Sequence, residues 1–160
     1  ADLSQVRITM ANLPDSPGNA AMIFSKLADN NVSVDMIIQS QAKDDNTNDI
    51  AFTVSKADLN QALKTLKEVK TEINTAEIIV DENIAKVSII GAGMIDRPGI
   101  ASCMFNSLGE NNINIKMIST SEIKISCLVD KDRAHDAVRA LHSSFNLDQD
   151  KEVVKVHGLS

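Results

Sequence analysis

Hydrophobic residues follow two different periods along this chain, and the two periods alternate. Val6, Ile8 and Met10 lie at every second position between polar neighbours, and so do Val87 and Ile89 further along. This period of two is typical of a strand with one buried face. Each such stretch is followed by a period close to 3.6, which is typical of an amphipathic helix. The residues that helical spacing places on the buried face are Ala20, Ala21, Phe24, Leu27 and Ala28 after the first strand, and Ala101, Met104, Phe105 and Leu108 after the second.

The second half of the chain repeats the first. The segment that begins Asp15-Ser-Pro-Gly aligns with the one that begins Asp96-Arg-Pro-Gly, and the alignment continues without a gap through the Asn-Asn pairs at 30–31 and 111–112. Asparagine pairs of this kind predict a turn. The polar loop at 44–48 makes the next connection longer in the first copy than in the second. Two copies of one unit therefore fill the chain.

Each copy continues with two strands, a second helix and a last strand. The order βαββαβ, found twice, predicts an α+β fold of two tandem ferredoxin-like units, each an antiparallel sheet with its helices on one face. A polar break at 81–83 places the boundary between domain 1 (1–82) and domain 2 (83–160). The expected strands are 32–39, 50–54 and 76–80 in the first copy and 113–120, 123–129 and 152–156 in the second; the second helices carry Leu59, Ala62, Leu63 and Leu66, or Ala134, Ala137, Val138 and Leu141, on one face.

Composition and charge narrow the classes of partner. The 160 residues carry a net charge of −6 at pH 7, which disfavours binding to the phosphate backbone of a nucleic acid. Aromatic residues make up 2% of the chain, too few for a base-stacking surface. No apolar run is long enough to span a membrane, and the first residues do not resemble a targeting signal. We therefore expect a cytoplasmic protein without nucleic-acid or membrane partners, in which Cys103 and Cys127 are free thiols.

The residues that catalysis requires do not form a recognisable set in this sequence. His135, His142 and His157 have no carboxylate or thiol at the spacing of a metal site. Gly91-Ala92-Gly93 follows a strand, but Asp96 replaces the third glycine of a dinucleotide-binding turn, and its charge would repel a pyrophosphate. We therefore expect no catalytic residues, no metal and no cofactor.

The Asp-x-Pro-Gly loop before each first helix is the best candidate for a binding site. The backbone amides at 18–20 and 99–101 lie where a helix has no internal hydrogen-bond acceptors, so they suit a carboxylate. Alternatively, Asp15 and Asp96 are helix caps, with the following proline in the first turn. The sequence leaves both interpretations open. Polar residues for the other groups of an amino acid come from the second strand of each copy: Asp35 and Gln39, or Asn114, Ser119 and Thr120.

Longer strings of residues point to a known family. Val87-Ser-Ile-Ile-Gly-Ala-Gly-Met94, Ile118-Ser-Thr-Ser-Glu-Ile-Lys-Ile-Ser126 and Ala137-Val-Arg-Ala-Leu-His142, together with the tandem units and their Asp-x-Pro-Gly loops, resemble the paired ACT domains of aspartate kinases. The resemblance covers nearly the whole chain. It implies a regulatory part without kinase activity of its own, either a separate subunit or a C-terminal half. It also implies a catalytic subunit or domain as partner, a homodimer formed through the ACT units, and an exchange of terminal strands between units.

The resemblance further implies feedback inhibition by threonine, lysine or both, in the biosynthesis of lysine, threonine and methionine from aspartate. Lys116 stands where some lysine-inhibited members have an acidic residue, which favours threonine because like charges repel. Each effector site is expected to combine two units. One site contains Asp15, Gly18, Ala20 and Gln39 with Asn114 and Ile115, and the other contains Met94, Asp96, Gly99, Ala101, Ser121 and Glu122 with Val34 and Asp35.

Two other functions are compatible with the same features. A stand-alone ACT-type metabolite sensor or oligomerisation module would have the same loops without a kinase partner, and copurification with a larger kinase chain would distinguish it. A small ferredoxin-like enzyme is the other alternative, and the lack of a recognisable acid, base and metal set argues against it.

Overall fold

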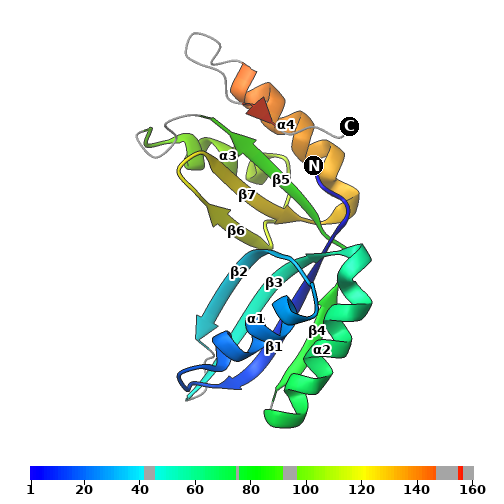
Figure 1. The fold of residues 1–160 in the computed structure, drawn as a ribbon. Coiled ribbons are helices and arrows are strands. Elements are labelled where there is room, and N and C mark those ends of the chain that lie inside the picture. Colours follow the sequence, from blue (N-terminus) through cyan, green and yellow to red (C-terminus); the bar gives the residue numbers. More distant parts are fainter. Residues whose placement is uncertain (42–45, 75, 92–96, 147–154, 157–160) are drawn as a thin grey trace. The chain divides into compact units, whose positions relative to one another are not determined.

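A computed structural model describes residues 1–41, 46–74, 76–91, 97–146 and 155–156, and the chain forms two compact units (Figure 1). One unit is Ser4–Glu82, and the other is Asn83–Ser160 together with Ala1–Leu3. Each unit has its own antiparallel sheet, helices and hydrophobic core. The prediction of an α+β fold with two ferredoxin-like βαββαβ units is confirmed.

The first unit has its two longest strands in the middle of the sheet, whose order is β2-β3-β1-β4. Residues of both helices belong to one core cluster with one face of these strands, so the helices cover the same face. The elements are β1 (Gln5–Pro14), α1 (Asn19–Asp29), β2 (Val34–Gln41), β3 (Thr47–Ser55), α2 (Leu59–Glu72) and β4 (Glu77–Asp81), with a 3-10 turn at Lys56–Asp58 before α2.

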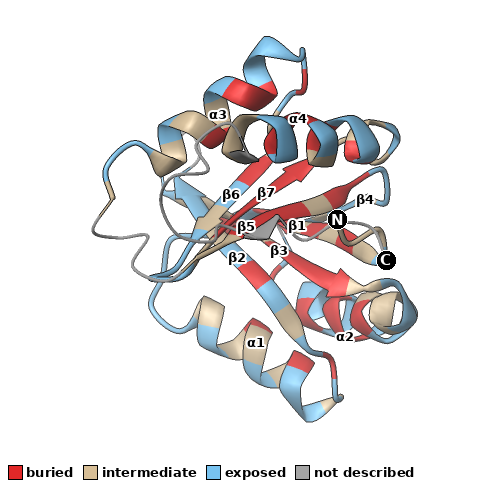
Figure 2. Cartoon of the chain, turned by 90° about the horizontal axis from the view of Figure 1, so that it is seen from above, coloured by how far each residue is buried: buried red, intermediate tan, exposed pale blue. Residues whose placement is uncertain are grey.

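The core of the first unit lies between this sheet and its helices. Alternate residues of β1 and β3 pair across the strands on the core side, Val6 with Val54 and Ile8 with Phe52, and all four are buried. Phe52 also packs edge to face against Phe24 of α1, with 5.4 Å between the ring centroids. Figure 2 shows the buried residues gathered on the strands and on the inner helix faces. Burial of this apolar surface is the main stabilising term for the unit.

The buried face of α1 differs from the predicted one. Ile23 and Leu27 are fully buried, whereas Ala21 and Ala28 are exposed. The isoleucine side chain buries more apolar surface than either alanine, and this difference sets the rotation of the helix about its axis.

The second unit repeats the arrangement, with strand order β6-β7-β5-β8. Its core contains Val87, Ile89, Met104 and Leu108, all fully buried. Residues 152–154 of the last predicted strand lie outside the described residues. The elements are β5 (Ala85–Ile90), α3 (Ile100–Glu110), β6 (Met117–Thr120), β7 (Lys124–Val129), α4 (Ala134–Asn146) and β8 (Lys155–Val156), with a 3-10 turn at Lys131–Arg133 before α4.

The helices α1 and α3 both end in the predicted Asn-Asn turn. Asn31 and Asn112 have a φ of 57°, in the left-handed region that asparagine tolerates better than most residues. After the second of these turns, Ile113 N donates to Leu108 O at 2.9 Å, which keeps Ile113 attached to the end of the helix and buried. The following strand therefore begins at Met117 rather than at 113.

The first three residues of the chain belong to the second unit. Asp2 forms an antiparallel bridge with Lys86 of β5, with N–O distances of 2.7 and 2.9 Å. Ala1 and Leu3 pack, partly buried, against the core of the second unit. The sequence-based boundary placed these residues in domain 1, whereas their backbone extends the other sheet.

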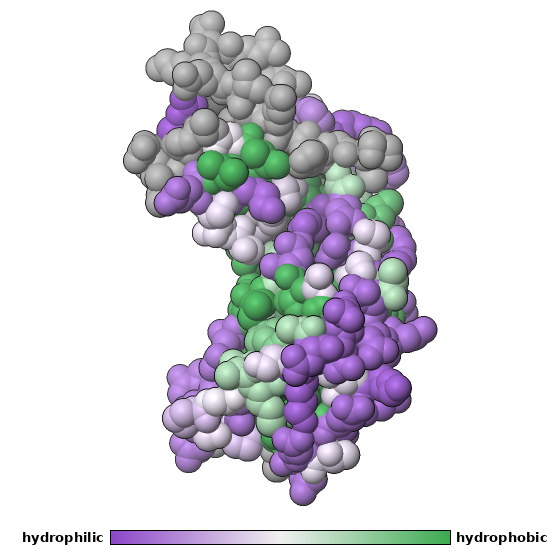
Figure 3. All heavy atoms as spheres, in the orientation of Figure 1, coloured by the Kyte–Doolittle hydropathy of each residue, from purple (hydrophilic) through white to green (hydrophobic). Residues whose placement is uncertain are grey.

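The first unit has a polar helix face and exposed apolar side chains on its edge strands. Lys64, Lys67 and Glu68 are exposed on the outer face of α2, which is hydrophilic in Figure 3. Ile37 on the edge strand β2 and Ile79 on the edge strand β4 are about half exposed, and Val80 beside Ile79 is exposed as well. Edge strands offer unpaired backbone groups to another strand.

Across the described ranges, no helix has the length and apolar character needed to cross a membrane.

Candidate functional site

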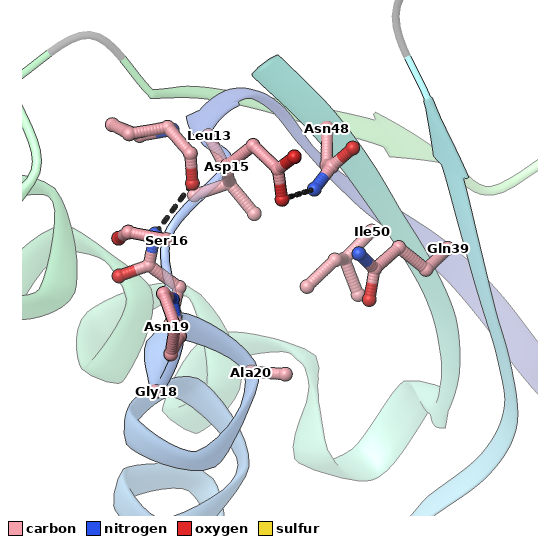
Figure 4. Close-up of a pocket in the computed structure, with 11 residues that line it drawn as sticks. Leu13, Asp15, Ser16, Gly18, Asn19, Ala20, Gln39, Asn48 and Ile50 are labelled. Atoms are coloured by element: carbon pink, nitrogen blue, oxygen red, sulfur yellow. Dashed lines mark hydrogen bonds between the residues drawn. The ribbon is translucent and has the colours of Figure 1, made fainter. Parts of the chain in front are cut away.

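A cavity of about 320 Å³ opens at one end of the first unit's core, beside the first turn of α1 (Figure 4). Leu13 and Ile50 provide apolar lining and are almost fully buried. A cavity of this size with a few polar groups around an apolar part suits a small molecule. Its lining comes from the end of β1, the β1–α1 loop, the first turn of α1, β2 and β3: Leu13, Pro14, Asp15, Ser16, Pro17, Gly18, Asn19, Ala20, Gln39, Asn48 and Ile50.

The sheet supplies polar side chains at this end, because the residues at its core-facing positions change from apolar to polar toward the cavity. Along β3 these positions are Val54, Phe52 and Ile50, followed by Asn48. Gln39 of β2 lies opposite Ile50, and so it faces the same side of the sheet. The apolar core thus ends in two carboxamide side chains that border the cavity.

The helix α1 begins without a side-chain cap in the described part of the chain. Gly18 is the N-cap residue, and its φ of 95° lies in the left-handed region that favours glycine. The first hydrogen bond of the helix joins Met22 N to Gly18 O, 2.9 Å apart. The amides of Asn19, Ala20 and Ala21 therefore precede the helical hydrogen bonds. Together with the helix dipole they form a favourable position for an anion.

The Asp15 carboxylate does not cap this helix. Its Oδ1 accepts a hydrogen bond from Asn48 Nδ2 at 2.8 Å, and its backbone N donates to Asn46 O at 2.7 Å. The interpretation of Asp15 as a helix cap is therefore wrong, and Pro17 precedes the N-cap instead of lying in the first turn. An acidic group and a set of amide donors border one cavity without neutralising each other (Figure 4).

This combination is complementary to a free amino acid. The amides of α1 can donate to its carboxylate, and Asp15 can accept from its ammonium. Gln39 and Ile50, on the other side of the cavity, offer a polar and an apolar contact to the side chain. All three parts of an amino acid thus have a partner of suitable chemistry.

The histidines, thiols and acidic groups are the side chains that could bind a metal ion, and the buried thiol of Cys127 has a shifted pKa. Among the described residues, no group of three or more His, Cys, Asp or Glu side chains could hold a metal ion. Cys127 is buried, and burial raises the pKa of its thiol to about 12. That thiol is therefore protonated at neutral pH and is a poor nucleophile.

Four residues predicted for the first effector site line the cavity together: Asp15, Gly18, Ala20 and Gln39. They come from the loop, from the first turn of α1 and from β2. Asn114 and Ile115 belong to the second unit, between α3 and β6, where Asn114 is exposed and Ile115 is half-buried. Their role in this site stays a prediction.

The start of α3 repeats the start of α1. Gly99 is the N-cap residue with a φ of 103°, and Cys103 N donates to Gly99 O at 2.8 Å. Ala101 therefore lies among the amides that precede the helical hydrogen bonds. Gly99 and Ala101 are two of the residues predicted for the second effector site.

The other described residues of the predicted second site lie in separate elements of the fold. Ser121 and Glu122 are exposed in the connection between β6 and β7. Val34 and Asp35 belong to β2 of the first unit. Two further members of this predicted site, Met94 and Asp96, lie outside the described residues.

The ammonium of Lys116 is paired within the second unit. Its Nζ lies 2.7 Å from Asp130 Oδ1 and donates to Asn83 O at 3.0 Å, within the second unit. The carboxylate offsets the ammonium charge, and the lysine side chain is only 19% exposed. The predicted repulsion between Lys116 and a lysine effector stays a prediction.

Asn48 and the apolar residues of the cavity are absent from the residues that the sequence predicts for the site. Asn48 lies two positions before Ile50, so it faces the same side of β3 as the core residues. This alternation along the strand is the sequence signal that could have identified Asn48. The signal was hidden because β3 begins at Thr47, inside the polar segment predicted as a loop. Leu13 faces inward because the register of β1 shifts between Met10 and Leu13.

The ACT domain family profile matches residues 6–69 and 87–145, one stretch in each unit. The chain belongs to the ACT domain family. An aspartate kinase of Stutzerimonas stutzeri is 48% identical over 144 residues, which are 90% of this chain and 35% of that protein. This ACT chain thus spans about a third of the length of that curated relative.

Solved structures of aspartate kinases contain the same tandem ACT fold. The ligand-free regulatory subunit of aspartate kinase from Thermus thermophilus is 40% identical, with a TM-score of 0.85 over 90% of this chain and 94% of that chain. The chain therefore corresponds to the regulatory region of an aspartate kinase, and the resemblance seen in the sequence is confirmed. E. coli aspartokinase III, solved in complex with lysine and aspartate, is 28% identical, with a TM-score of 0.66 over 87% of this chain and 30% of that chain.

Replacing Gly18 by alanine should destabilise the first ACT domain by about 1 to 2 kcal/mol, because the φ of 95° is unfavourable for an L-residue. A Cβ at this position meets nothing within 4 Å, so the cost comes from the backbone alone. Urea unfolding followed by circular dichroism measures this loss.

Gly109→Ala is the matched control. Gly109 lies inside α3, its Cβ position is equally open, and its φ is not positive. Alanine there should stabilise the protein by about 0.5 to 1 kcal/mol. If the two substitutions changed the free energy of unfolding by the same amount, the backbone strain assigned to Gly18 would be refuted.

Proposed function

We propose that this chain is the amino-acid-binding part of an aspartate kinase and that it gives the enzyme feedback inhibition by threonine, by lysine or by both. The inhibited pathway is the biosynthesis of lysine, threonine and methionine from aspartate. One observation carries the proposal. The cavity of the first ACT domain places the Asp15 carboxylate and the free amides of α1 where they match the two charges of an amino acid.

Threonine suits this cavity better than lysine does. Its carboxylate can lie on the amides of α1, its ammonium beside Asp15, its hydroxyl near Gln39 and its methyl group against Ile50. Asp15 is the single acidic residue among the described residues that line the cavity. The second ammonium of lysine would therefore lack a carboxylate partner in that lining, and an unpaired charge in a partly desolvated site is unfavourable.

Lysine is the second candidate effector, and the start of α3 is the second candidate site for an amino-acid carboxylate. The complex of E. coli aspartokinase III with lysine supports an amino-acid effector of this kind. Gly99 and Ala101 provide free amides there, as Gly18 and Ala20 do at the start of α1.

We further propose that the chain is a homodimer formed through its ACT domains. Ile37 on the edge strand β2 and Ile118 on the edge strand β6 are 52% and 39% exposed, and they give these edges apolar surface for a partner. Asn114 and Ile115 would complete the first effector site across units. The proposed domains are 1–82 and 83–160, except that residues 1–3 group with the second unit.

The kinase activity is proposed to lie outside this chain, in a catalytic subunit or domain. The chain spans 35% of the Stutzerimonas enzyme, which leaves most of that protein for the catalytic part. Adding this chain to the catalytic part should make the kinase sensitive to threonine. If the chain bound threonine but did not change kinase activity, it would be a stand-alone sensor instead.

A thermal melt against a panel of amino acids tests the proposed ligand class. A ligand at a hundred times its dissociation constant should stabilise the folded chain by about 2.7 kcal/mol, which raises the melting temperature by several degrees. Threonine should give the largest shift, followed by lysine. A melting temperature that no amino acid changes would be incompatible with an effector-binding function.

Asp15→Ala should lower the affinity for threonine about ten- to a hundredfold, because it removes a charge-assisted hydrogen bond to the ammonium. Calorimetric titration measures the change, and circular dichroism verifies the fold. Asp96→Ala, the equivalent substitution in the second copy, should affect threonine less. Unchanged threonine affinity in folded Asp15→Ala would exclude Asp15 from the site.

A further inference from the structure

The start of β3 and the residue just before it, Asn46, hold the loop that carries Asp15. Asn46 O accepts from Asp15 N at 2.7 Å, and Asn48 Nδ2 donates to Asp15 Oδ1 at 2.8 Å. Asp49 Oδ1 accepts from Asn12 N at 3.0 Å. The two hydrogen bonds of Asp15 attach the loop to the start of a strand that has neighbours on both sides, β1 and β2, and the bond of Asn12 joins β1 to the same strand.

Asn48 is held more firmly than the carboxylate that it contacts. Its backbone lies opposite Leu13 of β1 and Gln41 of β2, so both neighbouring strands fix its position. Asn48 is half-buried, whereas Asp15 is exposed on a loop. A donor fixed in this way restricts the rotamers of the carboxylate, because the hydrogen bond forms in only one of them. Asn48 therefore sets the direction in which the Asp15 side chain points.

We propose that Asn48 is a positioning residue of the effector site, which keeps the Asp15 carboxylate available for a ligand ammonium. This inference rests on the proposed function of the cavity. The hydrogen bond from Asn48 occupies Oδ1, and Oδ2 of Asp15 has no hydrogen-bond donor in the part of the chain that the structure describes. Oδ2 is thus left to accept from the ammonium of the amino acid.

The same hydrogen bond keeps Asp15 away from the start of α1. An aspartate three residues before the N-cap glycine can otherwise turn toward the free amides of the helix and compete with the carboxylate of the ligand. Asn48 thus protects two binding contacts at once, the one that Asp15 makes and the one that the amides make.

A double-mutant cycle on threonine affinity tests this role. Calorimetric titration compares the wild-type 160-residue chain with Asp15→Ala, Asn48→Ala and the double variant. Asn48→Ala alone should weaken threonine binding about three- to tenfold, less than Asp15→Ala does, because the carboxylate stays in place and loses only the donor that orients it. In the Asp15→Ala background it should change the affinity by less than about twofold, because the carboxylate through which Asn48 acts is gone.

Asp49→Ala is the matched control for this cycle. It also removes a side-chain hydrogen bond made by β3 near the cavity, but this bond joins β3 to the backbone of Asn12 in β1 and not to Asp15. Its effect on threonine affinity should therefore be the same in the wild-type and Asp15→Ala backgrounds. Circular dichroism and thermal melts verify that all variants are folded.

The outcomes separate the positioning role from the proposed function. If Asn48→Ala weakened binding equally in both backgrounds, or had no effect, the positioning role would be wrong while the threonine site would stand. If the wild-type chain did not bind threonine, the threonine site would be wrong and the role of Asn48 would be wrong with it.

Discussion

A hydrogen bond of 2.8 Å from Asn48 keeps the Asp15 carboxylate apart from the uncapped start of α1. Aspartate is among the strongest helix-capping residues, so a side chain in this loop would readily bind the free amides. Such a cap would satisfy the acid and the amides at the same time, and neither would be left for a ligand. Because the two stay apart, the cavity has an acidic side and an amide side, which is the charge pattern that an amino acid requires.

The rest of the first ACT domain holds these two groups in place. Packing of Ile23 and Leu27 against the sheet fixes α1, and the left-handed backbone of Gly18 turns the loop into the helix. The register shift in β1 lets Leu13 face inward, and the pairing of Leu13 with Asn48 fixes the donor beside the loop. The cavity is therefore the open end of the core, where apolar positions of the strands give way to polar ones.

The sequence predicts the order of the elements because hydrophobic period and turn residues act locally. The same resemblance that indicates the family also identifies Gly18, Ala20 and Gln39, which the structure places around one cavity. The direction of the Asp15 side chain could not be predicted, since it depends on Asn48, 33 residues away in a polar segment without a hydrophobic period. The ion pair of Lys116 with Asp130 was hidden for the same reason, because it joins residues that only the folded sheet brings together.

Backbone NMR of the chain during a titration with threonine tests most directly whether the site lies at the start of α1. The amides of residues 19–21 should show the largest changes in chemical shift, because they precede the helical hydrogen bonds and would donate to the ligand carboxylate. The amides of α4, in the other unit and outside both predicted sites, serve as the internal reference and should change little. Saturating binding of threonine that left the amides of residues 19–21 unchanged would contradict this placement of the site.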